Sequence, residues 1–230
     1  FANNETGIIQ PIDKVREITK KFGIVFHSDA VQAVGRIDIS FKQLGIDMMT
    51  LSSHKIGGPL GAGALVLASK KNMQPLFYGG QQEESLRSGT EPLLCIAGFG
   101  EAARSTNIRK MSKVKELRDY LENELKKLKL GIKIIGNNSK RLPNTVMINV
   151  PNIKADTLLI ALDLEGFETS TGSACSSGKV EPSFVLKQMG FNNNVAASSI
   201  RLSLGYENSF EDIKKFIDTL LKIYKRINND

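Results

Sequence analysis

Short apolar runs alternate with amphipathic segments along the first 110 residues, and this alternation limits the possible fold more than any other feature. IVFHSDA (24–30), DMMTLSS (47–53) and GALVLAS (63–69) are brief apolar runs bounded by glycine or polar residues, as strands usually are. Before them, apolar residues recur at helical spacing over residues 12–22. Strands that alternate with helices predict an α/β fold, with a parallel-type sheet and helices on both of its faces.

A smaller α/β region is expected to follow. Its predicted elements are a helix over residues 114–129, a strand at TVMINV, a helix at ADTLLIALDLEG, a strand at SSIRLSLG and a closing helix over FEDIKKFIDTLLKIYKRI. We therefore expect two domains, residues 1–110 and residues 111–230.

Composition narrows the class of protein. With 230 residues, of which 41% are hydrophobic, the chain can bury a core. No apolar run approaches the roughly 18 to 20 residues of a membrane span, and FANNETG lacks the parts of a signal peptide. Two cysteines make no disulfide framework, which predicts a cytoplasmic protein. The net charge of +7 is spread through helical patterns, which favours solvated helix faces over a nucleic-acid surface.

Polar residues gather where two of the predicted strands end. Asp29 follows the first strand, and Ser52, His54 and Lys55 follow the second. Ligands of parallel sheets collect at the carboxyl ends of strands. A desolvated lysine is the usual nucleophile for a carbonyl, and a buried carboxylate needs a cation such as a pyridinium nitrogen. Pyridoxal phosphate has both an aldehyde and a pyridinium nitrogen, so it fits both residues. Lys55 would bind its aldehyde and Asp29 its ring nitrogen, and Ser52 and His54 would bind its phosphate.

Each of these residues also has a simpler interpretation. Lys55 alone is typical of a loop lysine, and Asp29 could cap a helix over AVQAVG. GGPLGAG could be a turn between strands, and its G-x-G does not open directly into a helix as a dinucleotide fingerprint requires. The joint occurrence and order of the residues favour the cofactor.

Several segments follow, in order and spacing, one known family. They are NNETGIIQPI, HSDAVQAVG, DMMTLSSHKIGGPLGAGAL, LRSGTEP, RLPNTVMI, GSACSSG, EPSFVL and SSIRLSLG. The chain resembles the class V, fold type I pyridoxal-phosphate enzymes, and among them the cysteine desulfurases of the NifS and IscS type. The resemblance implies that residues 1–110 are the C-terminal part of the cofactor-binding major domain, which would be incomplete. Residues 111–230 would be the small domain that carries the catalytic-cysteine loop.

The resemblance also implies roles for single residues. Lys55 would form the Schiff base, Asp29 would pair with the pyridine nitrogen, and Gln32 and Asn4 would hydrogen bond to the ring hydroxyl. Ser52 and His54 would bind the phosphate, and Thr90 would reach the phosphate of a neighbouring subunit. Arg201 would hold the substrate carboxylate. The role of Thr90 implies a homodimer. A guanidinium suits a carboxylate because it can bond both oxygens at once.

Cys175 resembles the catalytic cysteine of the family. It would take sulfur from L-cysteine as a persulfide and leave L-alanine, with Lys55 moving the Cα proton. Its setting, GSACSSGKVEPS, is small and polar, which predicts a loop that passes sulfur to an iron–sulfur scaffold protein or a tRNA-thiolation acceptor. No resident metal is expected, although Cys175 is a candidate for transient ligation of a cluster through a partner. Cys95 fits a helical apolar pattern and is expected in the core.

The sequence also departs from the family. The ring-stacking histidine and the Gly-Ala-Thr-Glu phosphate loop of relatives do not occur here. We therefore expect the activity in the parent protein, and weak cofactor binding or none by this chain alone. Two other interpretations remain open: a related enzyme, such as a selenocysteine lyase or a class V aminotransferase, and an inactive piece that keeps only dimer and scaffold surfaces.

Overall fold

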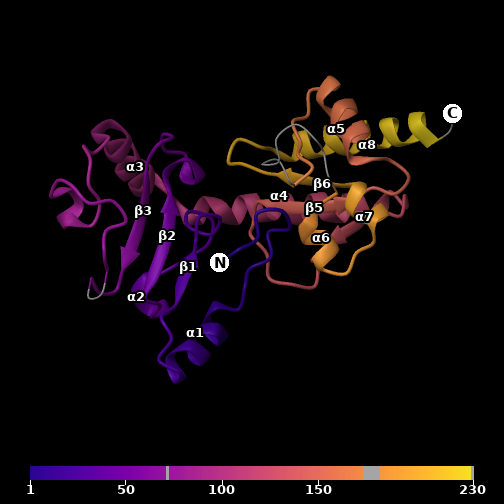
Figure 1. The fold of residues 1–230 in the computed structure, drawn as a ribbon. Coiled ribbons are helices and arrows are strands. Elements are labelled where there is room, and N and C mark those ends of the chain that lie inside the picture. Colours follow the sequence, from indigo (N-terminus) through magenta and orange to yellow (C-terminus); the bar gives the residue numbers. More distant parts are fainter. Residues whose placement is uncertain (71–72, 173–181, 229–230) are drawn as a thin grey trace. The chain divides into compact units, whose positions relative to one another are not determined.

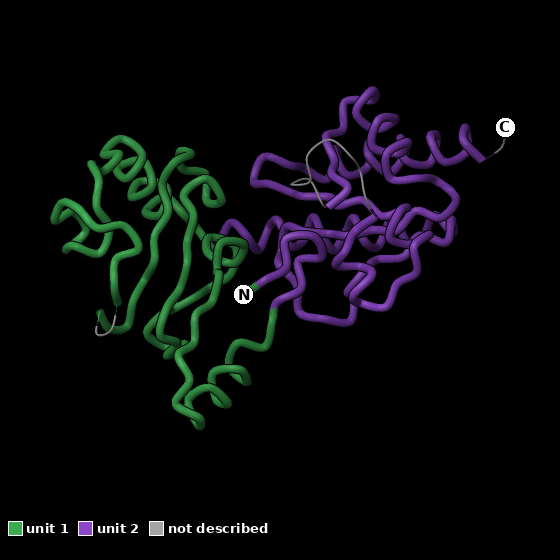
Figure 2. The backbone as a smooth tube through the Cα atoms, viewed as in Figure 1, with its two compact units in different colours: residues 1, 10–108 green, residues 2–9, 109–230 purple. Residues whose placement is uncertain are grey.

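The computed structural model describes residues 1–70, 73–172 and 182–228 and divides into two compact units (Figure 2). Unit 1 is residue 1 with residues 10–108, and unit 2 is residues 2–9 with residues 109–230. Among the described helices, none is both long and apolar enough to span a bilayer.

The sheet of unit 1 has three strands in the order β1, β2, β3 (Figure 1). Strands β1 (His27–Asp29) and β2 (Met48–Ser52) are parallel, as expected, whereas β3 (Gly63–Leu67) is antiparallel to β2. The α/β class is thus confirmed, but the sheet is mixed. Strand β3 runs antiparallel to β2 because the connection over residues 53–62 is short, and a parallel crossover needs about a dozen residues or more.

Five described helical segments accompany this sheet: α1 (Ile12–Lys21), α2 (Phe41–Leu44), the 3₁₀ turns η1 (Ser53–Ile56) and η2 (Gln82–Ser85), and α3 (Leu93–Ser105). The small core of unit 1 consists of Ile12, Ala30, Ile46 and Met49 with half-buried neighbours. Helix α3 buries none of its residues, although its sequence is apolar. The expectation that Cys95 belongs to the core is therefore wrong: the residue is half-buried, because apolar spacing marks a helix face without showing what covers it.

Unit 2 is built on a second, antiparallel sheet in the order β4, β5, β6. Strands β5 (Thr145–Asn149) and β6 (Ser199–Ser203) match the two predicted strands, and β5, in the centre, is buried along its whole length. Strand β4 (Lys133–Ile135) was not predicted, because three residues beside a lysine-rich helix end carry too little pattern to recognise.

Helices pack on this second sheet to form the larger core. They are α4 (Ile108–Lys127), α5 (Ala155–Leu164) and α8 (Phe210–Asn228). Helices α6 (Phe184–Gln188) and α7 (Asn193–Ala197) belong to a smaller cluster with Ile135 and Met147. Fully buried leucines of α4, α5 and α8, among them Leu117, Leu158 and Leu220, meet Val146 and Ile200 of the sheet. Burying a side chain of this size stabilises a fold by about 1.5–3 kcal/mol.

Residues 2–9 join unit 2 through backbone hydrogen bonds. The N–H of Ile9 donates to the carbonyl of Lys140 over 2.9 Å, and the N–H of Leu142 donates to the carbonyl of Gly7 over 2.8 Å. Gly7 has a positive φ of 72°, and a Cβ there would lie 2.9 Å from the Cβ of Thr145. The glycine of NNETG is thus required both by its backbone conformation and by its close approach to β5.

Candidate functional site

The carboxyl ends of β1 and β2 lie at one edge of the unit 1 sheet. Asp29 ends β1 opposite Thr50, and Ser52 ends β2 two residues further on. The Oγ of Ser52 and the Nδ1 of His54 are hydrogen bonded over 2.8 Å. The structure therefore brings a carboxylate, a hydroxyl and an imidazole to the edge where the sequence predicts a ligand.

Lys55 lies just beyond this edge in a single 3₁₀ turn, η1 (Ser53–Ile56), and is half-buried. Its carbonyl accepts a 3.2 Å hydrogen bond from Nη2 of Arg36, while Nη1 of Arg36 donates to the carbonyl of Gln32 over 2.8 Å. Arg36 therefore ties the backbone of Gln32 to that of Lys55. The sequence offers no signal for this link, since a guanidinium that bonds two carbonyls belongs to no local pattern.

The alternative interpretation of Asp29 as the cap of a helix over AVQAVG is wrong, because no helix forms there. Residues 31–36 make hydrogen-bonded turns, and Oδ1 of Asp29 accepts the N–H of Val31 over 2.9 Å. The alternative interpretation of GGPLGAG is confirmed, because the segment is a turn between β2 and β3. Both findings are compatible with a site here, since a short Asp-stabilised turn and a glycine turn each leave backbone close to the strand ends.

Glycines let α3 approach this turn closely. A Cβ on Gly58 would lie 2.3 Å from the Oγ of Ser53 and 3.1 Å from the Cβ of Ala102, and a Cβ on Gly98 would lie 2.8 Å from the ring of Pro59. Real Cβ atoms essentially never make contacts under 3.0 Å, so a side chain at either position would force its neighbours to move. The glycine turn beside Lys55 is thus held from outside by a helix.

The residues of this edge fit pyridoxal phosphate by their chemistry. A carboxylate suits the ring nitrogen, a hydroxyl with an imidazole suits the phosphate, and an amine suits the aldehyde. The hydroxyls of Ser28 and Ser53 are buried without a hydrogen-bond partner among the described residues. Such groups are unusual in a folded core and common where a ligand or water completes the network.

Arg201 lies in β6 of unit 2, where its backbone pairs with Met147 and bridges to Ser170. Its Nη1 donates to the carbonyl of Asn4 over 2.9 Å. Its Nε is buried and finds no acceptor within the described part of the chain. The guanidinium has N–H donors beyond the one used by Asn4, so it can still bond a carboxylate, as the predicted role requires.

Thr90 and Cys175 are the remaining predicted residues. Thr90 is exposed in the loop between η2 and α3, and its expected contact is with a second subunit. Cys175 falls within residues 173–181, outside the described residues. His27, interpreted as structural, forms a 2.7 Å hydrogen bond between its Nε2 and the Oγ1 of Thr50 on the neighbouring strand.

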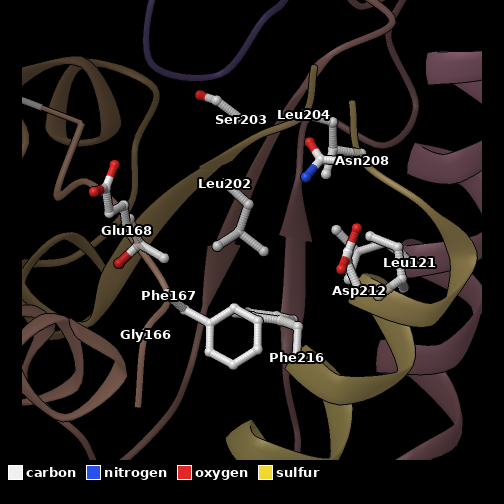
Figure 3. A pocket seen from close by; sticks show the side chains of 12 residues that line it. Leu121, Gly166, Phe167, Glu168, Leu202, Ser203, Leu204, Asn208, Asp212 and Phe216 are labelled. Atoms are coloured by element: carbon white, nitrogen blue, oxygen red, sulfur yellow. The ribbon is translucent and has the colours of Figure 1, made fainter. Parts of the chain in front are cut away.

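A pocket of about 440 Å³ lies elsewhere in unit 2, beside β6 and the start of α8 (Figure 3). Leu202 and Phe216 line its apolar part, with Glu168 and Asp212 on opposite sides. Successive side chains of a strand point to opposite faces, so Arg201 and Leu202 face different ways. The pocket does not include a predicted site residue.

The comparisons with known proteins agree with the fold. The family model for class-V aminotransferases matches residues 1–216, so the chain belongs to the class-V aminotransferase family. This family and its cysteine desulfurase members depend on pyridoxal phosphate.

Within that family, the similar proteins are cysteine desulfurases. The chain is 39% identical to cysteine desulfurase IscS of Dictyoglomus turgidum, over 98% of this chain and 58% of that protein. It is 41% identical to IscS of Clostridium botulinum over the same shares. A solved NifS-like protein from Rickettsia africae superposes with a TM-score of 0.88 at 44% identity, over 97% of this chain and 60% of that one. The chain thus spans a little under 60% of the length of the curated relatives it matches.

Proposed function

We propose that the protein containing this chain is a pyridoxal-phosphate-dependent cysteine desulfurase. The observation that carries the proposal is the edge of the unit 1 sheet, where Asp29, Ser52 and His54 lie next to Lys55. The NifS and IscS names of its relatives support the same activity, and another solved relative, SspA, is described in complex with cysteine, with a TM-score of 0.73 at 30% identity over 88% of this chain and 56% of that one.

When bound, pyridoxal phosphate supplies an aldehyde for an amine and a ring that withdraws electrons from the substrate Cα. Asp29 would balance the charge of the ring nitrogen, and Gln32 and Asn4 would bond the ring hydroxyl. Ser52 and His54, already joined by a hydrogen bond, would hold the phosphate. Thr90 would reach the phosphate of a second subunit, which makes the proposed protein a homodimer.

The substrate is handled by three side chains. Arg201 would bind the carboxylate of L-cysteine through its guanidinium. The ε-amine of Lys55 would attach the cofactor, and once displaced by substrate it would move the proton at Cα. The thiolate of Cys175 would attack the substrate sulfur, so that the carbon–sulfur bond breaks and a sulfur–sulfur bond forms. The substrate carbon then takes up a proton, and the products are L-alanine and a persulfide on Cys175.

The two parts of the chain would have different functions, one in binding the cofactor and one in sulfur transfer. Residues 1–110 would be the C-terminal part of the cofactor domain, and residues 111–230 the small domain that presents Cys175. We further propose that an iron–sulfur scaffold protein, or another sulfur acceptor such as a tRNA-thiolation enzyme, receives the sulfur. A reducing compartment keeps the nucleophilic thiol free of disulfides, which supports a cytoplasmic location.

The test uses the protein expressed from its whole gene. It should show visible absorbance from bound cofactor and form alanine from L-cysteine, and Lys55→Ala should abolish both. Lys70→Ala, at an exposed lysine of the same unit, is the matched control and should change neither. Cofactor binding without alanine formation would refute the desulfurase proposal and favour an aminotransferase.

A further inference from the structure

Glu5 is a buried carboxylate in the NNETG turn of unit 2, and no role has been assigned to it so far. The turn that carries it is fixed by Asn3, whose Oδ1 accepts the backbone N–H groups of Glu5 and Thr6, each over 2.9 Å. The hydroxyl of Thr6 donates to the same oxygen over 3.0 Å. Glu5 therefore projects from a backbone with little freedom.

The carboxylate of Glu5 contacts both sides of the segment that contains Cys175. The hydroxyl of Ser183 donates a hydrogen bond to Oε2 of Glu5, and the contact is buried. On the other side, Gly172 packs so closely that a Cβ would lie 3.1 Å from the same oxygen. Gly172 also has a positive φ of 88°, so its conformation and its packing both favour glycine.

Ser183 is itself well anchored. Its Oγ accepts the N–H of Leu186 over 3.1 Å and so caps α6, while Leu186 is fully buried. A single hydroxyl thus joins Glu5 to the start of a helix packed in the core. The described ends of the segment, Gly172 and Ser183, are thereby held against one rigid turn.

The same turn also contacts Arg201. The carbonyl of Asn4, next to Glu5, accepts the 2.9 Å hydrogen bond from Nη1 of Arg201. The turn therefore connects the residue proposed to hold the substrate with the two ends of the segment proposed to deliver the thiol. Proteins raise reaction rates in part by holding the backbone that carries a nucleophile at a fixed position relative to the substrate.

We propose that Glu5 is a positioning residue, which fixes the two ends of the Cys175 segment through Ser183 and Gly172. Its effect on catalysis rests on the proposed desulfurase function, whereas its effect on the segment does not. The two effects can therefore be measured separately.

The first experiment needs no activity. Lys179 is the one lysine or arginine between Gly172 and Ser183, so trypsin reports on this segment when cleavage there is compared with cleavage at Lys154. Glu5→Ala should raise the cleavage ratio about fivefold, because it removes the buried hydrogen bond to Ser183, the anchor that follows the segment. Glu5→Gln keeps an acceptor oxygen for Ser183 and should stay within about twofold of the original protein. An unchanged ratio in Glu5→Ala would overturn the proposal.

The second experiment measures alanine formation by the whole protein. Glu5→Ala should lower kcat about tenfold while KM for L-cysteine and the cofactor absorbance stay within about twofold. A rise in KM with unchanged kcat, or loss of the cofactor, would show a merely structural role. If the original protein forms no alanine, the proposed function fails while the trypsin ratio still decides the role of Glu5. Should Glu5→Ala not fold, Ser183→Ala removes the same hydrogen bond and must give the same cleavage result.

Discussion

Replacing Arg201 by lysine tests the substrate side of the site. The change keeps the positive charge and removes the planar fork, including the buried Nε–H that has no partner among the described residues. A hydrogen bond to a charged group contributes about 1.5–3 kcal/mol. Losing one such bond to the substrate carboxylate should therefore lower kcat/KM for L-cysteine by about 10- to 150-fold, since 1.4 kcal/mol is a factor of ten.

Alanine formation over a range of L-cysteine concentrations measures this effect. The loss should fall mainly on KM, because the carboxylate is held alike before and during the reaction. Arg226→Lys is the matched control, since its guanidinium is largely exposed, 3.9 Å from Glu165, and should change nothing measurable. If Arg201→Lys leaves kcat/KM within about twofold, the assignment of Arg201 to the carboxylate is refuted.

Two further predictions concern stability. Glu122→Ala should lower the free energy of unfolding by about 3–5 kcal/mol in urea titrations, because it leaves the buried guanidinium of Arg141, 2.7 Å away, without its counter-charge. Glu124→Ala, which breaks an exposed pair on the same helix, should cost little, and equal effects would contradict this account. At α8, hydrogen bonds from the side chain and backbone of Ser209 lower the pKa of Asp212 below its usual 3.8. Its contribution is thus present above pH 3.8 and lost as the pH falls through the lowered pKa, so the difference in Tm between the original protein and Asp212→Asn should shrink below about pH 4. A difference independent of pH would be inconsistent with this explanation.

Local patterns predicted most elements of the fold. Helix α8 is long and periodic, and strands β5 and β6 are short apolar runs; all three form where the sequence places them. The antiparallel direction of β3 follows from the length of the loop before it, which periodicity does not measure. Residues 31–36 form turns instead of the helix that the alternative interpretation of Asp29 required, because the segment is too short for helical hydrogen bonds to outweigh the cost of starting a helix.

The candidate site could be predicted only in part. The strand ends identify Asp29 and Ser52, and the parallel pairing of β1 and β2 places them at one edge. Arg36 and Glu5 could not be found in this way, because each acts by contacts with residues far along the chain. Neither a buried carboxylate that accepts a serine hydroxyl nor an arginine that bonds two carbonyls has a signature in sequence spacing.

The central claim is that sulfur passes from L-cysteine to Cys175 with the help of Lys55. The direct measurement is peptide mass mapping of the whole protein after a short exposure to L-cysteine. We predict one added sulfur atom on the peptide that contains Cys175, none on the peptide that contains Cys95, and none on either in Lys55→Ala. Sulfur on Cys95, or continued alanine formation with persulfide absent from Cys175, would contradict the account.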